Sequence, residues 1–283
     1  MKNKYIEQTM RFVFLAAACV SIAATITICI FLFANGVPAM LKIGLKNFIF
    51  GLKWKPSIDL YGIFPMIIGS ITVTLGALIL GVPLGLFTAV FLARYCPKQL
   101  YNFFESGVKL LAGIPSVVYG FFGLTVIVPA IRNTFGGNGT SILAASIVLA
   151  IMILPTIISV SESSIRAVPS LYFEGSLALG ACKERSIFLV ELKAAKSGIM
   201  AGIILGVGRA VGETMAVIMV AGNQAILPRS LVKGIRTLTA NIVLEMGYAA
   251  DLHRDALIAT SVILFIFILI INLCFSLLKE KKE

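Results

Sequence analysis

The residues best suited to chemistry in this chain are an arginine and a glutamate that stand inside a long apolar stretch. Residues 197–222 carry no charged side chains other than Arg209 and Glu213. If the stretch spans a membrane, exposing a charge to lipid at its centre costs about 2.5–3.5 kcal/mol or more, so both side chains are expected to face protein or a polar pathway. Their i, i+4 spacing predicts an ion pair along one helix.

Glycines in the same stretch indicate which side of this helix is packed. Gly198, Gly202 and Gly206 recur every four residues, so they share one helix face and let a second helix approach closely. Glu213 returns to nearly the same face, and Arg209 lies on or beside it. The two charges are therefore expected on the packed side of the helix.

The pair of charges permits two interpretations, and both remain open. It is either a structural ion pair that joins this helix to a neighbour or part of an anion pathway. In the pathway interpretation, the planar donors of Arg209 bind a phosphate-like oxyanion, and Glu213 holds the arginine until the anion displaces it. Thr214, which follows Glu213, belongs to the same candidate pathway.

A helix break is expected in another apolar stretch, residues 110–131. Gly113, Pro115 and Ser116 interrupt it, and proline removes a backbone donor and kinks a helix. In lipid the freed carbonyl must be satisfied by protein or water, so the break is expected to face the interior of a helix bundle. It is either an ordinary kink or a hinge whose backbone lines a pathway.

Other chemistry is not indicated by the sequence. It contains no Gly-Lys dipeptide and so no Walker A loop, no H-E-x-x-H, no G-x-S-x-G and no Cys-x-x-Cys. The single histidine, His253, is expected to be solvated, and the single tryptophan, Trp54, is expected to anchor the membrane interface. No catalytic residue, cofactor or metal ligand is predicted, and if ATP drives this protein, another chain binds it.

The composition requires a membrane around most of the chain. Of its 283 residues 59% are hydrophobic and 13% are charged, about half the roughly 25% of charged residues in soluble domains. A membrane span needs about 20 apolar residues. Six stretches reach that length: residues 12–33, 63–93, 110–131, 141–161, 197–222 and 256–278. The sequence therefore predicts an all-α, polytopic membrane protein with about six transmembrane helices.

Lysines and arginines near the span ends indicate the orientation. With the N-terminus inside, more of them lie in inner than in outer segments. Both termini and the polar loop 162–196, which contains Cys182, are therefore expected in the cytoplasm. Trp54, Asn138 and His253 are expected outside. The net charge of +11 is attributed to attraction by anionic lipid headgroups, and nucleic acid is not expected as a partner.

The loop 162–196 resembles the EAA signature of ABC importer permeases. In that family the loop folds as short coupling helices that dock in a groove on a separate ATPase. The residues that carry the resemblance, and are the predicted ATPase-coupling residues, are Glu174, Gly175, Ser176, Gly180, Val190 and Leu192. Gly175 and Ser176 stand where the family usually has Ala-Ala, and Lys193 replaces its usual final proline. These differences concern the geometry of docking.

Two further segments resemble PstC-type permeases of bacterial phosphate ABC importers. They are residues 110–124, LLAGIPSVVYGFFGL, and residues 208–223, GRAVGETMAVIMVAGN. Residues 176–199 align with the coupling region of the same family. The Glu-Thr-Met-Ala-Val run at residues 213–217 favours the PstC type over the sister PstA type, in which Ala-Pro tends to follow Glu-Thr. The resemblance covers most of the chain after residue 63.

This resemblance implies the type I ABC importer permease fold, with cytoplasmic coupling helices, in a bacterial cytoplasmic (inner) membrane. It implies that the chain and a second, PstA-like permease form the pathway of a phosphate importer. The other implied partners are a PstB-like ATPase dimer, which hydrolyses ATP, and a PstS-like extracytoplasmic phosphate-binding protein. The chain is expected to divide into residues 1–62, with the first transmembrane helix and outer loop, and residues 63–283, a core permease domain with five transmembrane helices.

Two alternatives to a phosphate importer remain. One is an importer of the same type for another oxyanion, such as sulfate or molybdate. The other is a secondary transporter, which would require ionisable residues on several spans for proton or sodium coupling. Only one of the six apolar stretches carries any such residue, so the sequence favours the importer.

Overall fold

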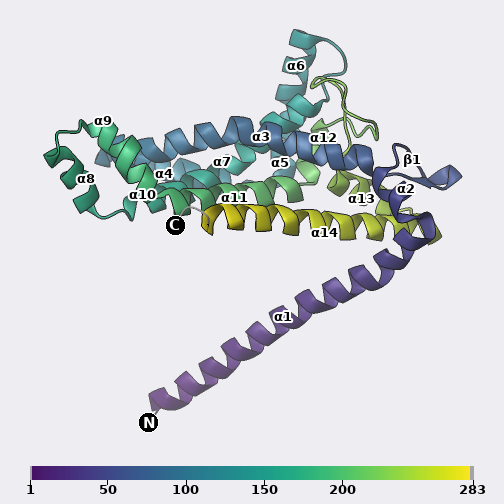
Figure 1. Cartoon of the computed structure of the whole chain (residues 1–283), viewed down its shortest axis with the longest axis horizontal. Coiled ribbons are helices and arrows are strands. Elements are labelled where there is room, and N and C mark those ends of the chain that lie inside the picture. The colour runs from purple at the N-terminus through teal and green to yellow at the C-terminus, as the bar shows by residue number, and fades with distance from the viewer. Residues whose placement is uncertain (1, 281–283) are drawn as a thin grey trace.

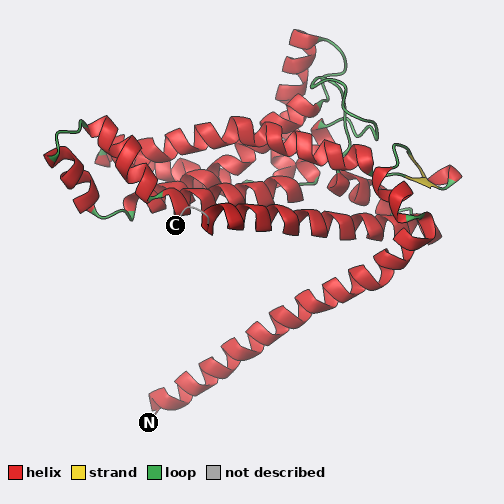
Figure 2. Cartoon of the chain, in the orientation of Figure 1, coloured by secondary structure: helices red, strands yellow, loops and turns green. Residues whose placement is uncertain are grey.

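The computed structural model of the chain describes residues 2–280, and the side chains of residues 7–274. This part of the chain is almost wholly helical (Figures 1 and 2). Its helices are α1 (Lys2–Ile43), α2 (Leu45–Phe50), α3 (Phe64–Val90), α4 (Lys98–Gly113), α5 (Ser116–Phe122), α6 (Val128–Phe135), α7 (Ile142–Arg166), α8 (Ser170–Ala178), α9 (Lys183–Ser186), α10 (Leu192–Ala194), α11 (Lys196–Gly212), α12 (Met215–Val220), α13 (Leu238–Met246) and α14 (Asp251–Glu280). Two short antiparallel strands, β1 (Trp54–Lys55) and β2 (Leu60–Tyr61), form a hairpin between α2 and α3.

Among the described residues, five helices are long and apolar enough to cross a membrane, which confirms the predicted all-α polytopic architecture. They cover Glu7–Ile43, Phe64–Tyr95, Ser116–Phe135, Ile142–Arg166 and Asp251–Cys274. The sixth apolar stretch is not one helix, because α11 ends at Gly212 and α12 begins at Met215. The prediction of a continuous helix through residues 197–222 is therefore wrong.

The central helix of the bundle is α7, and its two main neighbours approach it through glycines. Gly81 of α3 lies so close that an added Cβ would sit 2.9 Å from Ile153. Gly202 of α11 faces Val160 in the same way, at 3.2 Å, and Gly198 and Gly206 also face α7. The predicted close approach along the glycines at 198, 202 and 206 is thus confirmed, and the approaching helix is α7.

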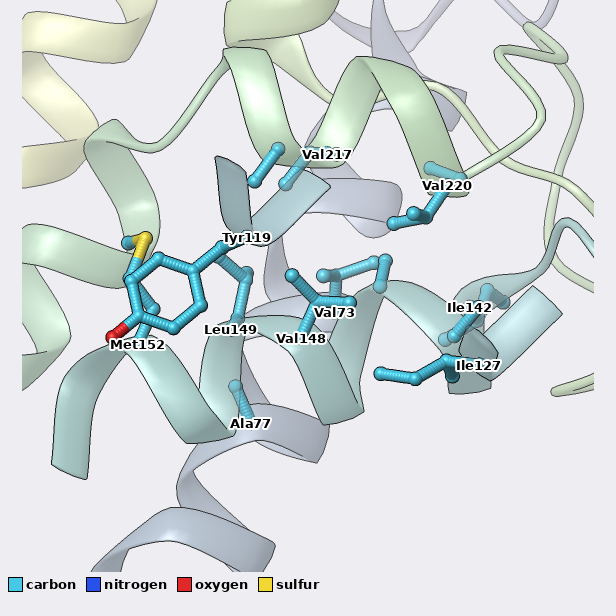
Figure 3. Close-up of a cluster of buried hydrophobic side chains, with 14 of the residues drawn as sticks. Val73, Ala77, Tyr119, Ile127, Ile142, Val148, Leu149, Met152, Val217 and Val220 are labelled. Carbon is cyan, nitrogen blue, oxygen red and sulfur yellow. The ribbon is translucent and has the colours of Figure 1, made fainter. Parts of the chain in front are cut away.

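Buried side chains of α3, α5 and α12 interlock with those of α7 (Figure 3). The cluster includes Val73 and Ala77 of α3, Tyr119 of α5, Val148, Leu149 and Met152 of α7, and Val217 and Val220 of α12. Lipid tails are as apolar as these side chains, so the hydrophobic effect does not hold the helices together. Their association depends on van der Waals contact between complementary surfaces.

The first helix is attached to the rest of the molecule near its C-terminal end. Gly36 of α1 packs against Ala259 and Val262 of α14, and the rings of Phe33 and Phe265 meet edge to face at 6.0 Å. From that crossing the N-terminal part of α1 runs away from the bundle (Figure 1). Most of its apolar side chains are exposed.

The connections gather at two opposite ends of the bundle (Figure 1). Helices α8 to α10 lie at the end where α1 begins and α14 ends, whereas the β1–β2 hairpin and α13 lie at the other end. The start of α1, the end of α14 and the loop 162–196 therefore lie at the same end of the bundle, but which end faces the cytoplasm stays a prediction. The cytoplasmic location of the termini themselves stays a prediction, and residues 1 and 281–283 lie outside the described residues.

The predicted orientation can be tested by thiol labelling at two exposed positions. Cys182 follows α8, and Asn138 lies in the turn between α6 and α7; both are exposed. In cells whose protein lacks the other cysteines, a membrane-impermeant maleimide should label Asn138→Cys in intact cells. It should label Cys182 only after the membrane is opened. Labelling of Cys182 in intact cells would reverse the orientation.

Candidate functional site

The break between α11 and α12 places a charged residue at a helix end. Glu213 has extended backbone, with φ −72° and ψ 130°. Its carboxylate accepts a hydrogen bond from the backbone N–H of Ala216 at 3.0 Å, so it satisfies a donor in the first turn of α12. The Thr214 hydroxyl donates to the Gly212 carbonyl at 3.3 Å. The polar side chains of the break thus replace the missing helical hydrogen bonds.

Because the helix ends before Glu213, the predicted ion pair does not form. Arg209 and Glu213 make no ion pair with each other, because a four-residue spacing brings two side chains together only along one continuous helix. The half-buried Arg209 instead points toward α7, where its Nη1 lies 3.5 Å from the hydroxyl of Thr156. That single long contact leaves most of the guanidinium donors available to a ligand.

The predicted break at Pro115 is confirmed and lies near the break at Glu213. Helix α4 ends at Gly113 and α5 begins at Ser116, so residues 110–113 belong to α4 and not to the span. The Tyr119 hydroxyl donates across the break to the Leu111 carbonyl at 2.7 Å. Helix α5 packs on α12, where Gly120 faces Ala216. Ser116 begins α5 and Thr214 directly precedes α12, so these two residues lie at the starts of neighbouring helices.

A small polar cavity lies behind Glu213. It is lined by Ser70, Thr74, Glu213, Thr237 and Thr239 among other residues. The Thr239 hydroxyl donates to the Glu213 carbonyl at 3.2 Å, and Ser70 accepts from the Leu238 N–H at 3.0 Å. These bonds tie the outer helix α13 to the break and to α3.

The predicted coupling residues lie at the α8–α10 end of the bundle and separate into two groups. Glu174, Gly175 and Ser176 lie on α8, a helix with no buried residue, and Gly180 follows it in the exposed turn. Gly180 has φ +86°, a conformation that L side chains rarely adopt, and no atom lies within 4 Å of an added Cβ. This group forms a free surface that presents Leu179, which is 91% exposed.

Val190 and Leu192 form the second group, and they face the bundle. Leu192 packs against a buried cluster that includes Ile165 of α7 and Ile199 of α11. Val190 lies in a π-helical turn, Ile187–Glu191, and lines a groove of about 730 Å³ beside Tyr172. The two groups therefore have different surroundings: the first is free to meet a partner, and the second attaches the loop to the spans.

Two arginines that the sequence analysis did not single out fix this loop to the spans. Arg94, which follows α3, pairs with the buried carboxylate of Glu191 at 2.8 Å and donates to the Ile165 carbonyl at 2.9 Å. Arg166, at the end of α7, donates to the Leu92 carbonyl at 2.9 Å and pairs with Glu162. Sequence offers little signal for the Arg94 contacts, because its partners lie far along the chain.

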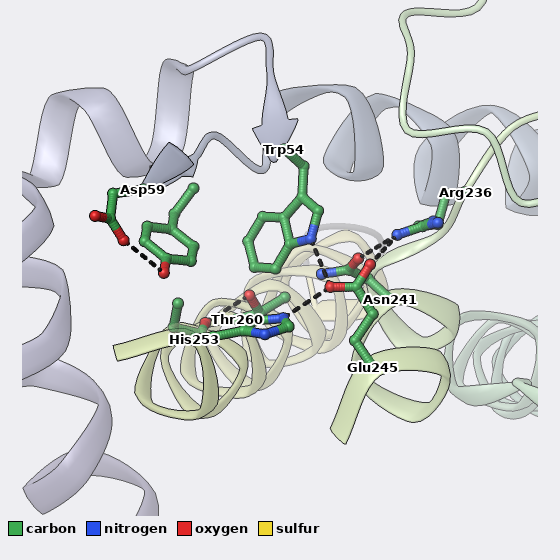
Figure 4. A network of polar contacts seen from close by, with 9 residues as sticks. Trp54, Asp59, Arg236, Asn241, Glu245, His253 and Thr260 are labelled. Carbon is green, nitrogen blue, oxygen red and sulfur yellow. Dashed lines mark hydrogen bonds and ion pairs between the residues drawn. The ribbon is translucent and has the colours of Figure 1, made fainter. Parts of the chain in front are cut away.

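A second polar cluster lies at the opposite end of the bundle, where the β1–β2 hairpin, α13 and α14 meet (Figure 4). Its centre is the carboxylate of Glu245. This carboxylate accepts from the Trp54 indole at 2.8 Å and pairs with Arg236 at 2.5 Å and with His253 at 2.8 Å. Asn241 accepts a further hydrogen bond from Arg236 at 3.0 Å.

This cluster corrects two expectations. Trp54 is buried and hydrogen-bonded rather than an anchor at the membrane interface, and His253 is half-buried and paired rather than solvated. The Trp54 contact was not visible in the sequence because Glu245 lies 191 residues away along the chain. Glu245 is only eight residues from His253, but their contact depends on how α13 and α14 pack. Beside the cluster, burial and the hydrogen bond to Asp59 raise the pKa of Tyr61, so the phenol stays protonated and donates to that carboxylate.

Comparison with known sequences identifies similar proteins along nearly the whole chain. The profile of the family described as binding-protein-dependent transport system inner membrane component matches residues 81–281. A probable ABC transporter permease protein, YqgH, of Bacillus subtilis is 38% identical, over 96% of this chain and 92% of that protein. A phosphate transport system permease protein, PstC, of Mesorhizobium japonicum is 34% identical, over 86% of this chain and 81% of that protein.

Solved structures show the same fold at low sequence identity. The inward-facing MetNI methionine ABC transporter aligns with a TM-score of 0.59 and 19% identity, over 82% of this chain and 100% of that chain. A bacterial alginate ABC transporter in complex with an alginate-bound periplasmic protein aligns with a TM-score of 0.61 and 14% identity, over 93% of this chain and 92% of that chain. The architecture of ABC importer permeases is therefore confirmed for this chain.

The Glu245 cluster predicts a large loss of stability on loss of one charge. Glu245→Gln leaves Arg236 and His253 without their carboxylate, and breaking a buried pair costs about 3–5 kcal/mol. Glu105→Gln is the matched control, because Glu105 pairs with Lys109 on the exposed surface of α4, where a pair contributes about 0–1 kcal/mol. Thermal unfolding of the purified proteins should separate the two variants. Equal midpoints would mean that the cluster contributes no more than a surface pair.

Proposed function

The chain belongs to the family of binding-protein-dependent transport system inner membrane components, and from that membership we propose that it is the PstC-type permease subunit of an ATP-driven phosphate importer. As a family member it is an ABC importer permease, a multi-pass membrane protein of the inner membrane. Phosphate as its substrate is the proposal. It is supported by the PstC relatives, which are 31–35% identical over most of the chain, and by the chemistry of Arg209.

The observation that carries the proposal is the half-buried guanidinium of Arg209 beside two broken helices. Its one hydrogen bond among the described residues is a 3.5 Å approach to a threonine hydroxyl. An anion that enters the membrane loses its hydration shell, and the planar donors of an arginine replace those hydrogen bonds with charge-assisted ones. We propose that Arg209, Glu213 and Thr214 line the translocation pathway, and that Pro115 and Ser116 form the break that opens onto it.

Glu213 has a different role in this proposal from the one its spacing suggested. Its carboxylate is engaged with the first turn of α12, and its carbonyl accepts from α13. It therefore fixes the break from which α12 begins and connects the break to the outer helix. A movement of α13 would displace this break relative to Arg209, which would change access to the pathway from outside.

The remaining subunits of the importer are proposed from the same resemblance. They are a PstA-like permease, with which this chain forms the pathway, a PstB-like ATPase dimer and a PstS-like extracytoplasmic phosphate-binding protein. The ATPase, and not this chain, would hydrolyse ATP. The exposed surface of α8 and the turn at Gly180 suit the ATPase contact, because they present apolar side chains such as Leu179 to solvent.

The same proposal divides the chain at residues 62 and 63. Residues 1–62 hold α1, α2 and the hairpin, and residues 63–283 would form the core permease domain with five transmembrane helices and the coupling loop at 162–196. Both termini would lie in the cytoplasm. The N-terminal part is joined to the core by the α1–α14 crossing and by the Trp54–Glu245 hydrogen bond.

Substitution of Arg209 tests the pathway. Arg209→Gln keeps most of the side-chain volume but removes a charged donor, whose hydrogen bonds contribute about 1.5–3 kcal/mol. Phosphate uptake is expected to fall roughly tenfold to a hundredfold at normal membrane abundance, and Arg209→Lys should retain part of it. Uptake of radiolabelled phosphate in cells that depend on this importer provides the measurement, with sulfate and molybdate as competitors.

The matched control is Arg132→Gln, because Arg132 is exposed at the end of α6, and its uptake should stay normal. The double variant Arg209→Met/Glu213→Leu removes both charges and is expected to be inactive. If that protein is abundant and transports phosphate at the normal rate, the pathway role of Arg209 is wrong. If sulfate or molybdate inhibits the uptake of labelled phosphate more strongly than unlabelled phosphate does, the pathway role of Arg209 stands but the substrate is the other oxyanion.

Substitution of Gly180 tests the ATPase contact. The φ of +86° strains any L side chain, but no atom lies within 4 Å of an added Cβ, and aspartate tolerates positive φ better than most residues. The strain of Gly180→Asp should therefore stay within the turn, and the fold should remain intact. It adds bulk and charge to the surface proposed to meet the ATPase, so uptake should be abolished while insertion stays normal. Gly136→Asp is the control, because Gly136 has φ +77° and equally open surroundings at the other end of the molecule. Wild-type uptake in Gly180→Asp would contradict the contact.

A further inference from the structure

A small pocket lies at the α8–α10 end of the bundle, between the end of α3, the start of α4 and the end of α7. Its volume is about 250 Å³, below the roughly 300–1,000 Å³ of pockets for drug-sized ligands, so it suits a single small group. The lining residues are Leu92, Ala93, Arg94, Cys96, Lys98, Tyr101 and Arg166. Three of these side chains are cations and none is an anion.

The neighbours of these cations leave the pocket positive. Arg94 pairs with Glu191 through one nitrogen, and its Nε is buried without a hydrogen-bond partner in the described part of the chain. Arg166 pairs with Glu162 and lies over the ring of Tyr101 at 4.3 Å.

Lys98 has no ion pair among the described residues, so its charge is not neutralised. It is also the first residue of α4, whose positive dipole end therefore lies at the pocket. Burial and the hydrogen bond to Glu162 raise the pKa of Tyr101, which keeps its phenol neutral and adds no negative charge to the pocket.

Helix α4 has the character of a helix that lies along a membrane surface. It has no buried residue, and its polar and apolar side chains occupy opposite faces. The exposed apolar side chains are Leu100, Phe103, Phe104 and Leu110. The opposite face carries Lys98, Asn102, Glu105 and Lys109. With its apolar face in lipid, α4 would hold Lys98 at the depth of the headgroups.

We infer that this pocket binds one phosphate group, presented by an anionic lipid headgroup of the inner leaflet, through Lys98, Arg94 and Arg166. The arginines supply donors in the planar geometry that suits phosphate oxygens. Lys98 supplies a point charge that neither Glu191 nor Glu162 neutralises. A phosphate bound here would link the end of α3, the start of α4 and the end of α7, the three segments to which the loop 162–196 is attached. The site is separate from the pathway proposed around Arg209.

The test uses the purified full-length chain in a neutral detergent and two matched variants. Lys98→Gln removes the unpaired charge, whereas Lys109→Gln removes a charge of the same helix that does not line the pocket. Native mass spectrometry measures the binding of phosphatidylglycerol, of phosphatidylcholine and of inorganic phosphate to each protein. Phosphatidylglycerol should bind wild type and Lys109→Gln equally and Lys98→Gln about fivefold more weakly, the effect of one basic residue near an anionic surface. Phosphatidylcholine should not distinguish the variants.

The arms of this experiment separate the sources of the phosphate group. If inorganic phosphate, and not the lipid, shows binding that depends on Lys98, the pocket is an anion site for free phosphate. If both ligands bind Lys98→Gln as tightly as wild type, the inference is overturned.

Cys96, which also lines the pocket, locates the ligand. In a chain whose other cysteines are replaced by serine, phosphatidylglycerol should slow the reaction of Cys96 with a neutral maleimide. This protection should be lost in Lys98→Gln. Lipid binding that depends on Lys98 but leaves Cys96 unprotected would place the ligand elsewhere and overturn the assignment.

Discussion

The structure depends on one constraint, which is that backbone polar groups have no water to bond within a membrane. The stretch 197–222 is broken between α11 and α12, and the span that begins with α5 is separated from α4 at Pro115, so the chain must supply partners for the groups that each break releases. At the first break the Tyr119 hydroxyl satisfies the Leu111 carbonyl, and at the second the Glu213 carboxylate satisfies the Ala216 N–H. Both breaks lie close together, because Gly120 of α5 faces Ala216 of α12. The pathway proposed around Arg209 lies beside them.

Glycine contacts hold α3 and α11 against α7, and side-chain contacts attach both ends of the molecule to this interior. Because glycines of α3 and α11 lie directly against α7 side chains such as Ile153 and Val160, neither helix can slide without displacing those side chains. At one end Arg94 and Glu191 attach the loop 162–196 to α3. At the other end Thr239 attaches α13 to Glu213. Direct side-chain contacts thus join the loop 162–196 to α3 and α13 to the break.

The features that were predictable from the sequence are those whose physical cause is local. Apolar length identified the spans, Pro115 identified one break, and the spacing of Gly198, Gly202 and Gly206 identified the face that meets α7. The second break was missed because Gly212 and Glu213 also fit a continuous helix, and the Ala216 bond that stabilises the break is visible only in three dimensions. The Glu245 cluster was missed for the same reason.

The surroundings of the arginines distinguish Arg209 from the structural charges of this chain. Three arginines are half-buried among the described side chains, Arg94, Arg209 and Arg236. Arg94 has the carboxylate of Glu191 and Arg236 has that of Glu245, as a charge removed from water requires. Arg209 has only a threonine hydroxyl at 3.5 Å. A half-buried charge without a counter-charge is less well stabilised than the two arginines that have a carboxylate. An anionic ligand that arrives from outside would supply the counter-charge that Arg209 lacks, as the transport role proposed for it requires.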